Sequence, residues 1–202
     1  MMHRMVVAAL SVLTIVACSP RYDVVIRNGT IYDGSGGDPY VGDLAITGDS
    51  IVAIGTVSGK GRTEIDATGL AVSPGFINVI AHPEESLIAD GRGMSDILQG
   101  VTLEVMGEGE SMGPWNDSLK AYAKTHEGDI KYDITWTTLD EYLQFLADKG
   151  VSPNVASFVG AATVRENVLG FANRDPTPEE LEQMQAIVTR PWRTVRSASP
   201  PR

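Results

Sequence analysis

Short β-branched runs separated by glycine and polar residues fill the chain from Tyr22 to Gly75. Asn28-Gly29 and Gly48-Asp49 each lie between two such runs, which predicts two hairpins with tight turns. Strands at this close spacing indicate a small β-sandwich. The runs that predict strands are residues 22–27, 30–33, 41–47, 50–55, 63–66 and 70–73.

The pattern changes after Gly75, where continuous apolar runs alternate with segments of helical period. Apolar runs of this kind are typical of parallel strands buried on both faces. Gly150 predicts the end of one helix, and Thr177-Pro178 predicts the start of another. The predicted strands are residues 76–80, 101–106 and 155–159, and the predicted helices include residues 95–99, 119–125 and 139–149.

Strands that alternate with helices predict a parallel sheet built from βα units, so the fold class is α/β. A closed (β/α)₈ barrel of the TIM type takes about 250 residues. Residues 76–188 supply about three βα units, which makes them the first part of an incomplete barrel. We therefore expect exposed strand edges and apolar faces that further units would cover.

The N-terminus has the pattern of an export signal. A short basic start is followed by an uncharged run, residues 5–17, which is too short to span a bilayer and ends at Cys18. The residues before Cys18 resemble the lipobox of bacterial lipoproteins, and a lone cysteine has no internal disulfide partner. Residues 1–18 therefore predict a lipoprotein signal peptide, with a protein anchored to the membrane through acylated Cys18 on the periplasmic or cell-envelope face. The alternative is a buried helix that ends in a cysteine.

Charge excludes one class of partner. The chain carries 16 basic and 26 acidic residues, a net charge of −10, and removal of residues 1–17 takes away Arg4 and leaves 15 against 26, or −11. Nucleic-acid binding needs clustered Lys and Arg, and no basic stripe is present. We expect no nucleic-acid partner.

The last residues differ from the rest of the chain. Residues 189–202 hold four arginines, three prolines and no acid, and the helical pattern before them stops at Val188. A shifted reading frame over this stretch would encode a peptide that continues the helix. A frameshift or gene fragment is the interpretation that we favour, and a genuine basic tail is the alternative.

Several short motifs carry a resemblance to a known family. The sequence Tyr-Asp-Val-Val-Ile-Arg-Asn-Gly-Thr-Ile-Tyr-Asp from Tyr22, followed by Pro-Gly-Phe-Ile-Asn at 74–78, is similar to the amidohydrolase superfamily. Gly-Val-Thr at 100–102, Val-Met-Gly at 105–107 and Arg-Asp-Pro-Thr-Pro-Glu-Glu-Leu at 174–181 resemble its N-acyl-D-amino-acid deacylase (D-aminoacylase) branch. The resemblance covers residues 22–188.

The resemblance implies metal-dependent hydrolysis of non-peptide carbon–nitrogen bonds in an N-acyl amino acid or a related amide. One or two divalent ions, zinc in this family, polarise the acyl carbonyl and lower the pKa of a bound water. The family's catalytic aspartate would lie beyond Val188, so no catalytic residue is expected in this chain. We expect little or no activity from it.

The family's first metal ligands form a His-x-His pair at the end of the first barrel strand. Its motif Pro-Gly-Phe-Ile-Asp-x-His-x-His aligns with residues 74–82, where Asn78 replaces the aspartate, Ile80 replaces the first histidine and His82 is the second. The resemblance therefore implies His82 as a metal ligand. The alternative is a loop histidine beside Pro83, and the adjacent acids Glu84 and Glu85 are interpreted as solvated.

The family resemblance also implies functional roles for two further residues. The branch has a glycine-flanked cysteine ligand after the second strand, and Glu108 stands in its place, where a carboxylate is chemically tolerable. The alternatives are Glu110 as the ligand or two simply exposed acids. Arg165 follows the third strand and could pair with a substrate carboxylate, with a helix-surface salt bridge as its alternative.

A second function remains open. The losses at Asn78 and Ile80 favour a non-catalytic lipoprotein that uses a degenerate amidohydrolase domain for binding. Metal binding would distinguish the two functions, because the enzyme needs a bound ion.

Overall fold

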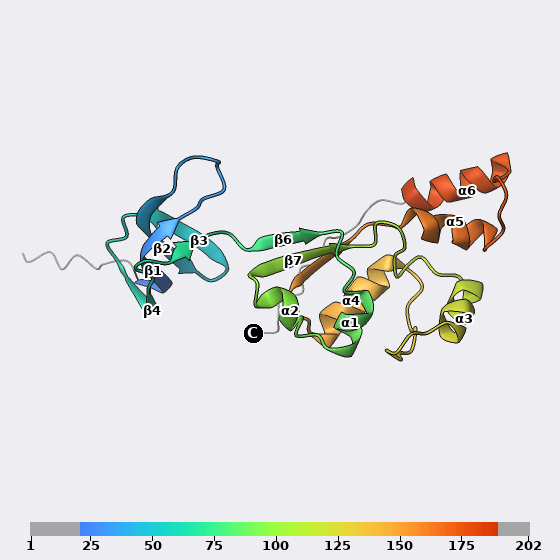
Figure 1. Cartoon of the computed structure of the whole chain (residues 1–202), viewed down its shortest axis with the longest axis horizontal. Helices are drawn as coiled ribbons and strands as arrows, with labels where there is room; N and C mark the ends of the chain where they lie inside the picture. Colours follow the sequence, from blue (N-terminus) through green and yellow to red (C-terminus); the bar gives the residue numbers. More distant parts are fainter. Residues whose placement is uncertain (1–20, 190–202) are drawn as a thin grey trace, which may run out of the picture. The chain divides into compact units, whose positions relative to one another are not determined.

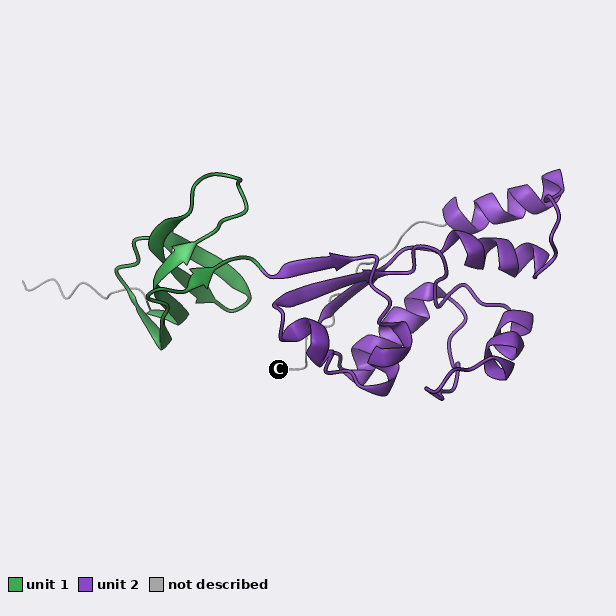
Figure 2. Cartoon of the chain, in the orientation of Figure 1, with its two compact units in different colours: residues 1–74 green, residues 75–202 purple. Residues whose placement is uncertain are grey.

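The computed structural model describes residues 21–189, so the predicted signal segment, Cys18 and the tail from residue 190 onward lie outside the described residues. The chain divides into two compact units, with the boundary between Pro74 and Gly75 (Figure 2). Within the described part, no helix has both the length and the apolar character needed to cross a bilayer.

The first unit is a five-stranded sheet in which β1 is central. The strand order is β3-β2-β1-β4, and β5 also pairs with β1. The β1–β2 and β2–β3 pairs are antiparallel, whereas β4 and β5 run parallel to β1. The strands are β1 (Arg21–Ile31), β2 (Tyr40–Thr47), β3 (Ser50–Gly55), β4 (Lys60–Asp66) and β5 (Ala71–Val72).

The first predicted hairpin is wrong, because β1 runs straight through Asn28-Gly29. Asn28 adopts a φ of 59°, and the register of β1 against β2 shifts between Ile26 and Gly29. Both sides of this irregularity pair with the same partner strand, so Arg27 and Asn28 form a β-bulge opposite Asp43 where a chain reversal was expected. The second predicted hairpin is confirmed, with Thr47 opposite Ser50 around Gly48-Asp49.

The core of the first unit is small. Val25, Ala45 and Val57 form its buried cluster. Arg27 ties the loop after β3 to the sheet, since its guanidinium donates to the carbonyl oxygens of Val57 (2.7 Å) and Gly59 (2.6 Å). Residues 21–74 thus contain one layer of the predicted β-sandwich.

The second unit is a three-stranded parallel sheet of order β6-β7-β8 with helices between and after its strands (Figure 1). The predicted α/β class and the alternation of strands and helices are confirmed. Two helices, α1 and α5, were not predicted. The elements are β6 (Phe76–Val79), α1 (Glu84–Ala89), α2 (Met94–Ile97), β7 (Val101–Met106), α3 (Asp117–Thr125), α4 (Leu139–Lys149), β8 (Asn154–Ser157), α5 (Ala161–Leu169) and α6 (Pro178–Thr189).

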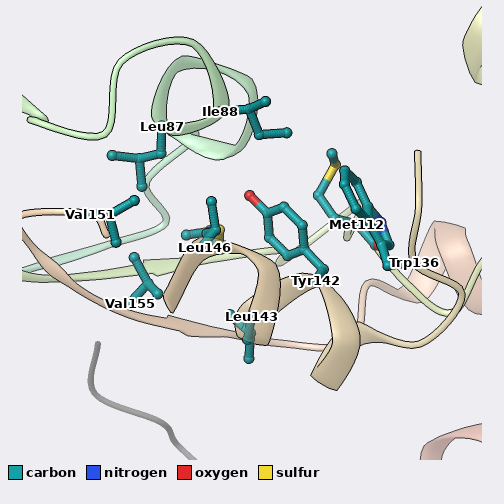
Figure 3. Packing of buried hydrophobic residues seen from close by; sticks show 10 residues of the cluster. Leu87, Ile88, Met112, Trp136, Tyr142, Leu143, Leu146, Val151 and Val155 are labelled. Atoms are coloured by element: carbon teal, nitrogen blue, oxygen red, sulfur yellow. The ribbon is translucent and has the colours of Figure 1, made fainter. Parts of the chain in front are cut away.

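One face of this sheet is covered by helices. Met106 of β7 and Val155 of β8, both 1% exposed, belong to a buried cluster with side chains of α1 and α4. Figure 3 shows Leu87 and Ile88 of α1 on the side toward which Tyr142 and Leu146 of α4 project. The hydroxyl of Tyr142 also donates to the backbone oxygen of Glu84 at 3.1 Å, which joins the two helices.

The other face of the sheet is open. Successive residues of a strand point to opposite faces. Ile77 and Val79 pair with Leu103 and Val105, the positions on either side of buried Glu104, so they lie on the face away from the helices. Ile77 is 59% and Val79 54% exposed. The exposed apolar face predicted for a partial barrel is therefore present.

Candidate functional site

The predicted ligand positions lie where the parallel strands of the second unit end. In barrels built from βα units, the active site lies at the carboxyl ends of the strands. Here β6 ends at Val79, β7 at Met106 and β8 at Ser157, and the segments that follow them form one rim. His82 and Glu108 are on two of these segments.

The segment after β6 begins with an unusual backbone. Ala81 continues the pairing with β7, because its N–H donates to the carbonyl oxygen of Val105 at 2.9 Å. Ile80, at the position of the family's first histidine, adopts a φ of 64° and is 52% exposed. A β-branched residue at positive φ is strained, and such strain clusters at functional sites. His82 follows as an exposed residue beside buried Pro83.

Glu84 was interpreted as a solvated acid, and this is wrong. Its side chain is half-buried at the start of α1. Desolvation raises its pKa above the ordinary value, while the backbone N–H of Gly107 and the charge of His82 act in the opposite direction. Glu84 is therefore partly desolvated and is not a free surface acid. Its neighbour Glu85 accepts a hydrogen bond from the hydroxyl of Tyr132 at 3.1 Å.

The segment after β7 places both of its acids in solvent. Glu108 and Glu110 are exposed, whereas Gly107 is buried at a φ of 81°. A side chain at Gly107 would collide with the Ser157 hydroxyl and the Phe158 carbonyl, and a Cβ at Gly160 would lie 2.6 Å from the oxygen of Gly109. Glycine is therefore required where the rim segments after β7 and β8 pack backbone against backbone.

Ser111 fixes these two segments to each other. Its hydroxyl accepts from the N–H of Gly160 (2.9 Å) and donates to the carbonyl of Gly113 (2.7 Å). Its own N–H donates to the hydroxyl of Thr163 on α5 at 2.8 Å. Ser111 and Thr163 are 3% and 2% exposed, so these bonds are shielded from water. Their role is to hold the rim in shape.

Arg165 is engaged by the protein itself. Its Nη2 donates to the carbonyl oxygens of Ala172 (2.9 Å) and Arg174 (2.6 Å), in the connection between α5 and α6. The neighbouring Glu166 has its pKa raised by burial and by the charge of Glu110. The substrate role of Arg165 stays a prediction, and the visible role of its guanidinium is to order this connection.

A buried acid lies on the helix-covered face, where sequence reasoning had predicted only an apolar strand. Glu104, in the middle of β7, is 1% exposed. Asn78, at the family's aspartate position, is directly opposite Glu104 in the β6–β7 ladder and donates from Nδ2 to Oδ1 of Asp96 at 3.1 Å. Asn78 is therefore held by α2 on the covered side of the sheet.

The described residues do not complete a metal centre. Between residues 21 and 189, no three side chains of His, Cys, Asp or Glu converge closely enough to hold an ion. His82 and Glu108 are both exposed and come from different segments. Catalytic zinc sites take three protein ligands, so these two positions supply only part of a set.

No protein-family model matches the chain. An N-acyl-D-aspartate deacylase from Alcaligenes xylosoxydans xylosoxydans is 33% identical over 168 residues, which cover 82% of this chain and 34% of that protein. An N-acyl-D-glutamate deacylase from Bordetella bronchiseptica, solved with zinc and a phosphonate mimic of the tetrahedral intermediate, matches with a TM-score of 0.72 at 28% identity. That match covers 83% of this chain and 35% of the other.

A solved D-aminoacylase with a binuclear metal centre matches with a TM-score of 0.69 at 30% identity. This match covers 83% of the present chain and 35% of the D-aminoacylase chain. The matches are with the amidohydrolase superfamily, the class that the β unit and the parallel βα units indicated. Within it, the chain is related to the N-acyl-D-amino-acid deacylase (D-aminoacylase) branch. The chain spans about a third of the length of the relatives that it matches.

Proposed function

We propose that this chain provides the N-terminal β unit and the first three βα units of a metal-dependent hydrolase that cleaves non-peptide carbon–nitrogen bonds in N-acyl amino acids. The observation that carries the proposal is the match to the deacylases, which extends through both units over 82% of the chain at 33% identity. A relative that binds zinc and a mimic of the tetrahedral intermediate has the same arrangement of strands and helices.

The chain by itself should support little or no turnover. A bound ion and a proton acceptor are both needed for hydrolysis of this type. Within residues 21–189, no three potential ligands converge. Ile80 cannot replace the histidine at its position, because its side chain has no donor atom for a metal.

The same observations support a second candidate, a non-catalytic lipoprotein that binds through a degenerate amidohydrolase domain. Asn78 is bonded to Asp96 on the covered face, and Ile80 presents an exposed apolar side chain at the rim. Both positions are thus adapted to something other than metal ligation.

Zinc binding distinguishes the two candidates. Isothermal titration of the full chain with zinc should show one weak site that is lost in Glu108→Gln and retained in the matched control Glu110→Gln, an exposed acid two residues away. Turnover of N-acyl-D-aspartate and N-acyl-D-glutamate should stay at background with and without zinc. Absence of any stoichiometric ion would favour the binding lipoprotein, and robust turnover would overturn the claim that the site is incomplete.

Export and lipid anchoring at Cys18 form a separate part of the proposal. The support is the uncharged run of residues 5–17 that leads into the only cysteine of the chain. Mass spectrometry of the mature protein should find Cys18 as an acylated N-terminus in the membrane fraction, and Cys18→Ser should abolish the modification. An unmodified Cys18 in a protein that retains residues 1–17 would contradict this part alone.

A further inference from the structure

Glu104 is a buried carboxylate for which the described residues supply no hydrogen-bond partner. It is 1% exposed, and neither Oε1 nor Oε2 has a partner. In the sheet it lies between Asn78 of β6 and Val155 of β8. The Asn78 amide, which could have donated to Glu104, donates to Asp96.

The groups that face Glu104 make an ionised carboxylate less favourable. Asp96 of α2 and Glu84 of α1 are the charges that act on it, and both are acidic. From α4 the neighbouring titratable group is Tyr142, whose pKa is itself raised by burial first and, in smaller part, by charges that include Glu84 and Glu104. The charges that act on Glu104 from α1 and α2 are therefore both negative, and no positive charge is among them.

An unpaired buried charge is among the most unfavourable groups in a protein interior, and such a group usually takes up a proton. Desolvation, followed by the charges of Asp96 and Glu84, raises the pKa of Glu104 to about 7. The neutral acid is then the form compatible with the packed layer at mildly acidic pH. Ionisation would leave a bare charge beneath α1 and α2.

We propose that Glu104 is a proton-binding switch: the neutral acid allows α1 and α2 to pack on β7, and its ionisation weakens that packing. β7 leads directly into the rim segment that carries Glu108. The switch therefore lies next to the candidate site without including its predicted ligands.

The direction of the pH effect follows from the two states of the chain. The unfolded chain has Glu104 near its ordinary pKa of 4.5, and the folded chain has it near 7. Folding thus takes up a proton between these values. The stability due to the neutral acid is complete below pH 4.5, falls as pH rises through the interval and is lost above pH 7.

Urea unfolding of the full chain at a series of pH values tests the switch. Across the interval, the Glu104 contribution should increase the unfolding constant by up to about tenfold per pH unit. Glu104→Gln, which cannot ionise, should remove that contribution. Glu182→Gln makes the same change at an exposed position of α6 and should leave the wild-type pH profile intact.

Two further measurements keep the proposal testable if Glu104→Gln folds poorly. Carbon-13 NMR of the wild-type chain should find the Glu104 carboxyl titrating near pH 7, and Asp96→Asn should lower that midpoint by removing a neighbouring charge. Amide hydrogen exchange in α1 and α2 should accelerate at pH 8 beyond the intrinsic rate increase, relative to α4.

Several results would overturn the proposal. A Glu104 midpoint at or below pH 4.5 would show that the carboxylate is ionised and accommodated. A midpoint that moves when magnesium or EDTA is added would show that a cation, and not a proton, neutralises the cluster. Unchanged exchange of α1 and α2 across the titration would show that ionisation does not affect their packing.

Discussion

The two faces of the β6-β7-β8 sheet differ in what covers them. On one face Met106 and Val155 are 1% exposed beneath α1 and α4, while on the other Ile77 and Val79 are 59% and 54% exposed. The covered face includes the polar Asn78 and Glu104 as well as apolar side chains, so apolar content does not decide which face is buried. The two faces differ because helices cover one of them, whereas Ile77 and Val79 on the other remain exposed.

The comparison shows which part of the second unit is complete as described. The covered face has the interlocked side chains of a finished core, in which even a carboxyl group is enclosed. The open face has the apolar character of a barrel interior, and the part of the chain that matches covers only about a third of the relatives that share this arrangement. Stability of the described unit should therefore depend on one face of the sheet and not on the other.

The largest expected effect is on the covered face. Leu146 of α4 is fully buried in its cluster. Leu146→Ala should lower the free energy of unfolding by about 2–5 kcal/mol, because it removes apolar contacts and leaves a cavity. Urea denaturation followed by circular dichroism measures the loss. Leu98→Ala, at a leucine that is 77% exposed, is the control and should change stability little.

A matched pair of substitutions compares the faces directly. Val155→Ala and Val79→Ala each remove two methyl groups in the same sheet. At Val155, which is 1% exposed, the lost methyl groups would leave a cavity in the covered core, so we expect a loss of about 1–3 kcal/mol. At Val79, which is 54% exposed, the change should be close to zero.

Equal losses at Val155 and Val79 would show that the open face is covered in solution. Self-association is the simplest way to cover it, and sedimentation velocity of the wild-type chain and of Val79→Ala would detect this. A shift toward the monomer in Val79→Ala, without a change in the monomer's own stability, would locate the contact on the open face.

Much of the fold could be predicted where local signals agree with long-range pairing. The bounds of β7 and α4 are as predicted, since an apolar run defines one and a cap at each end defines the other. The hairpin predicted at Asn28-Gly29 was wrong because an Asn in the left-handed conformation followed by Gly is compatible with a β-bulge as well as with a tight turn. The choice between them depends on pairing of Thr30 with Val41, which local sequence does not reveal.

The candidate site was less predictable. The resemblance to deacylases indicated His82 and Glu108 as metal-ligand positions, and their role as ligands stays a prediction. Glu104 and Glu84 were missed because burial of an acid depends on α1 and α2, and α1 itself was not predicted. A glutamate at a helix-facing position of an otherwise apolar strand was the available signal for Glu104. Its significance emerges only when the helices that cover it are known.

The smallest expected effect concerns how α4 begins. Thr138 accepts from the N–H of Glu141 at 3.2 Å, and the Glu141 carboxylate accepts from the N–H of Thr138 at 2.9 Å, which forms a capping box. Thr138→Ala should reduce the global free energy of unfolding by about 1 kcal/mol, because α4 forms part of the covered core.

Thr177→Ala is the matched control for this cap. Thr177 and Glu180 make the same pair of bonds at the start of α6, at 3.3 Å and 2.8 Å, yet α6 contains no buried residue. Loss of this cap should therefore increase hydrogen exchange within α6 and leave the global urea midpoint unchanged, since an exposed helix can fray without opening the core. A shift of the midpoint as large as that of Thr138→Ala would show that α6 is part of the cooperative unit, and that the covered face extends further than its buried side chains indicate.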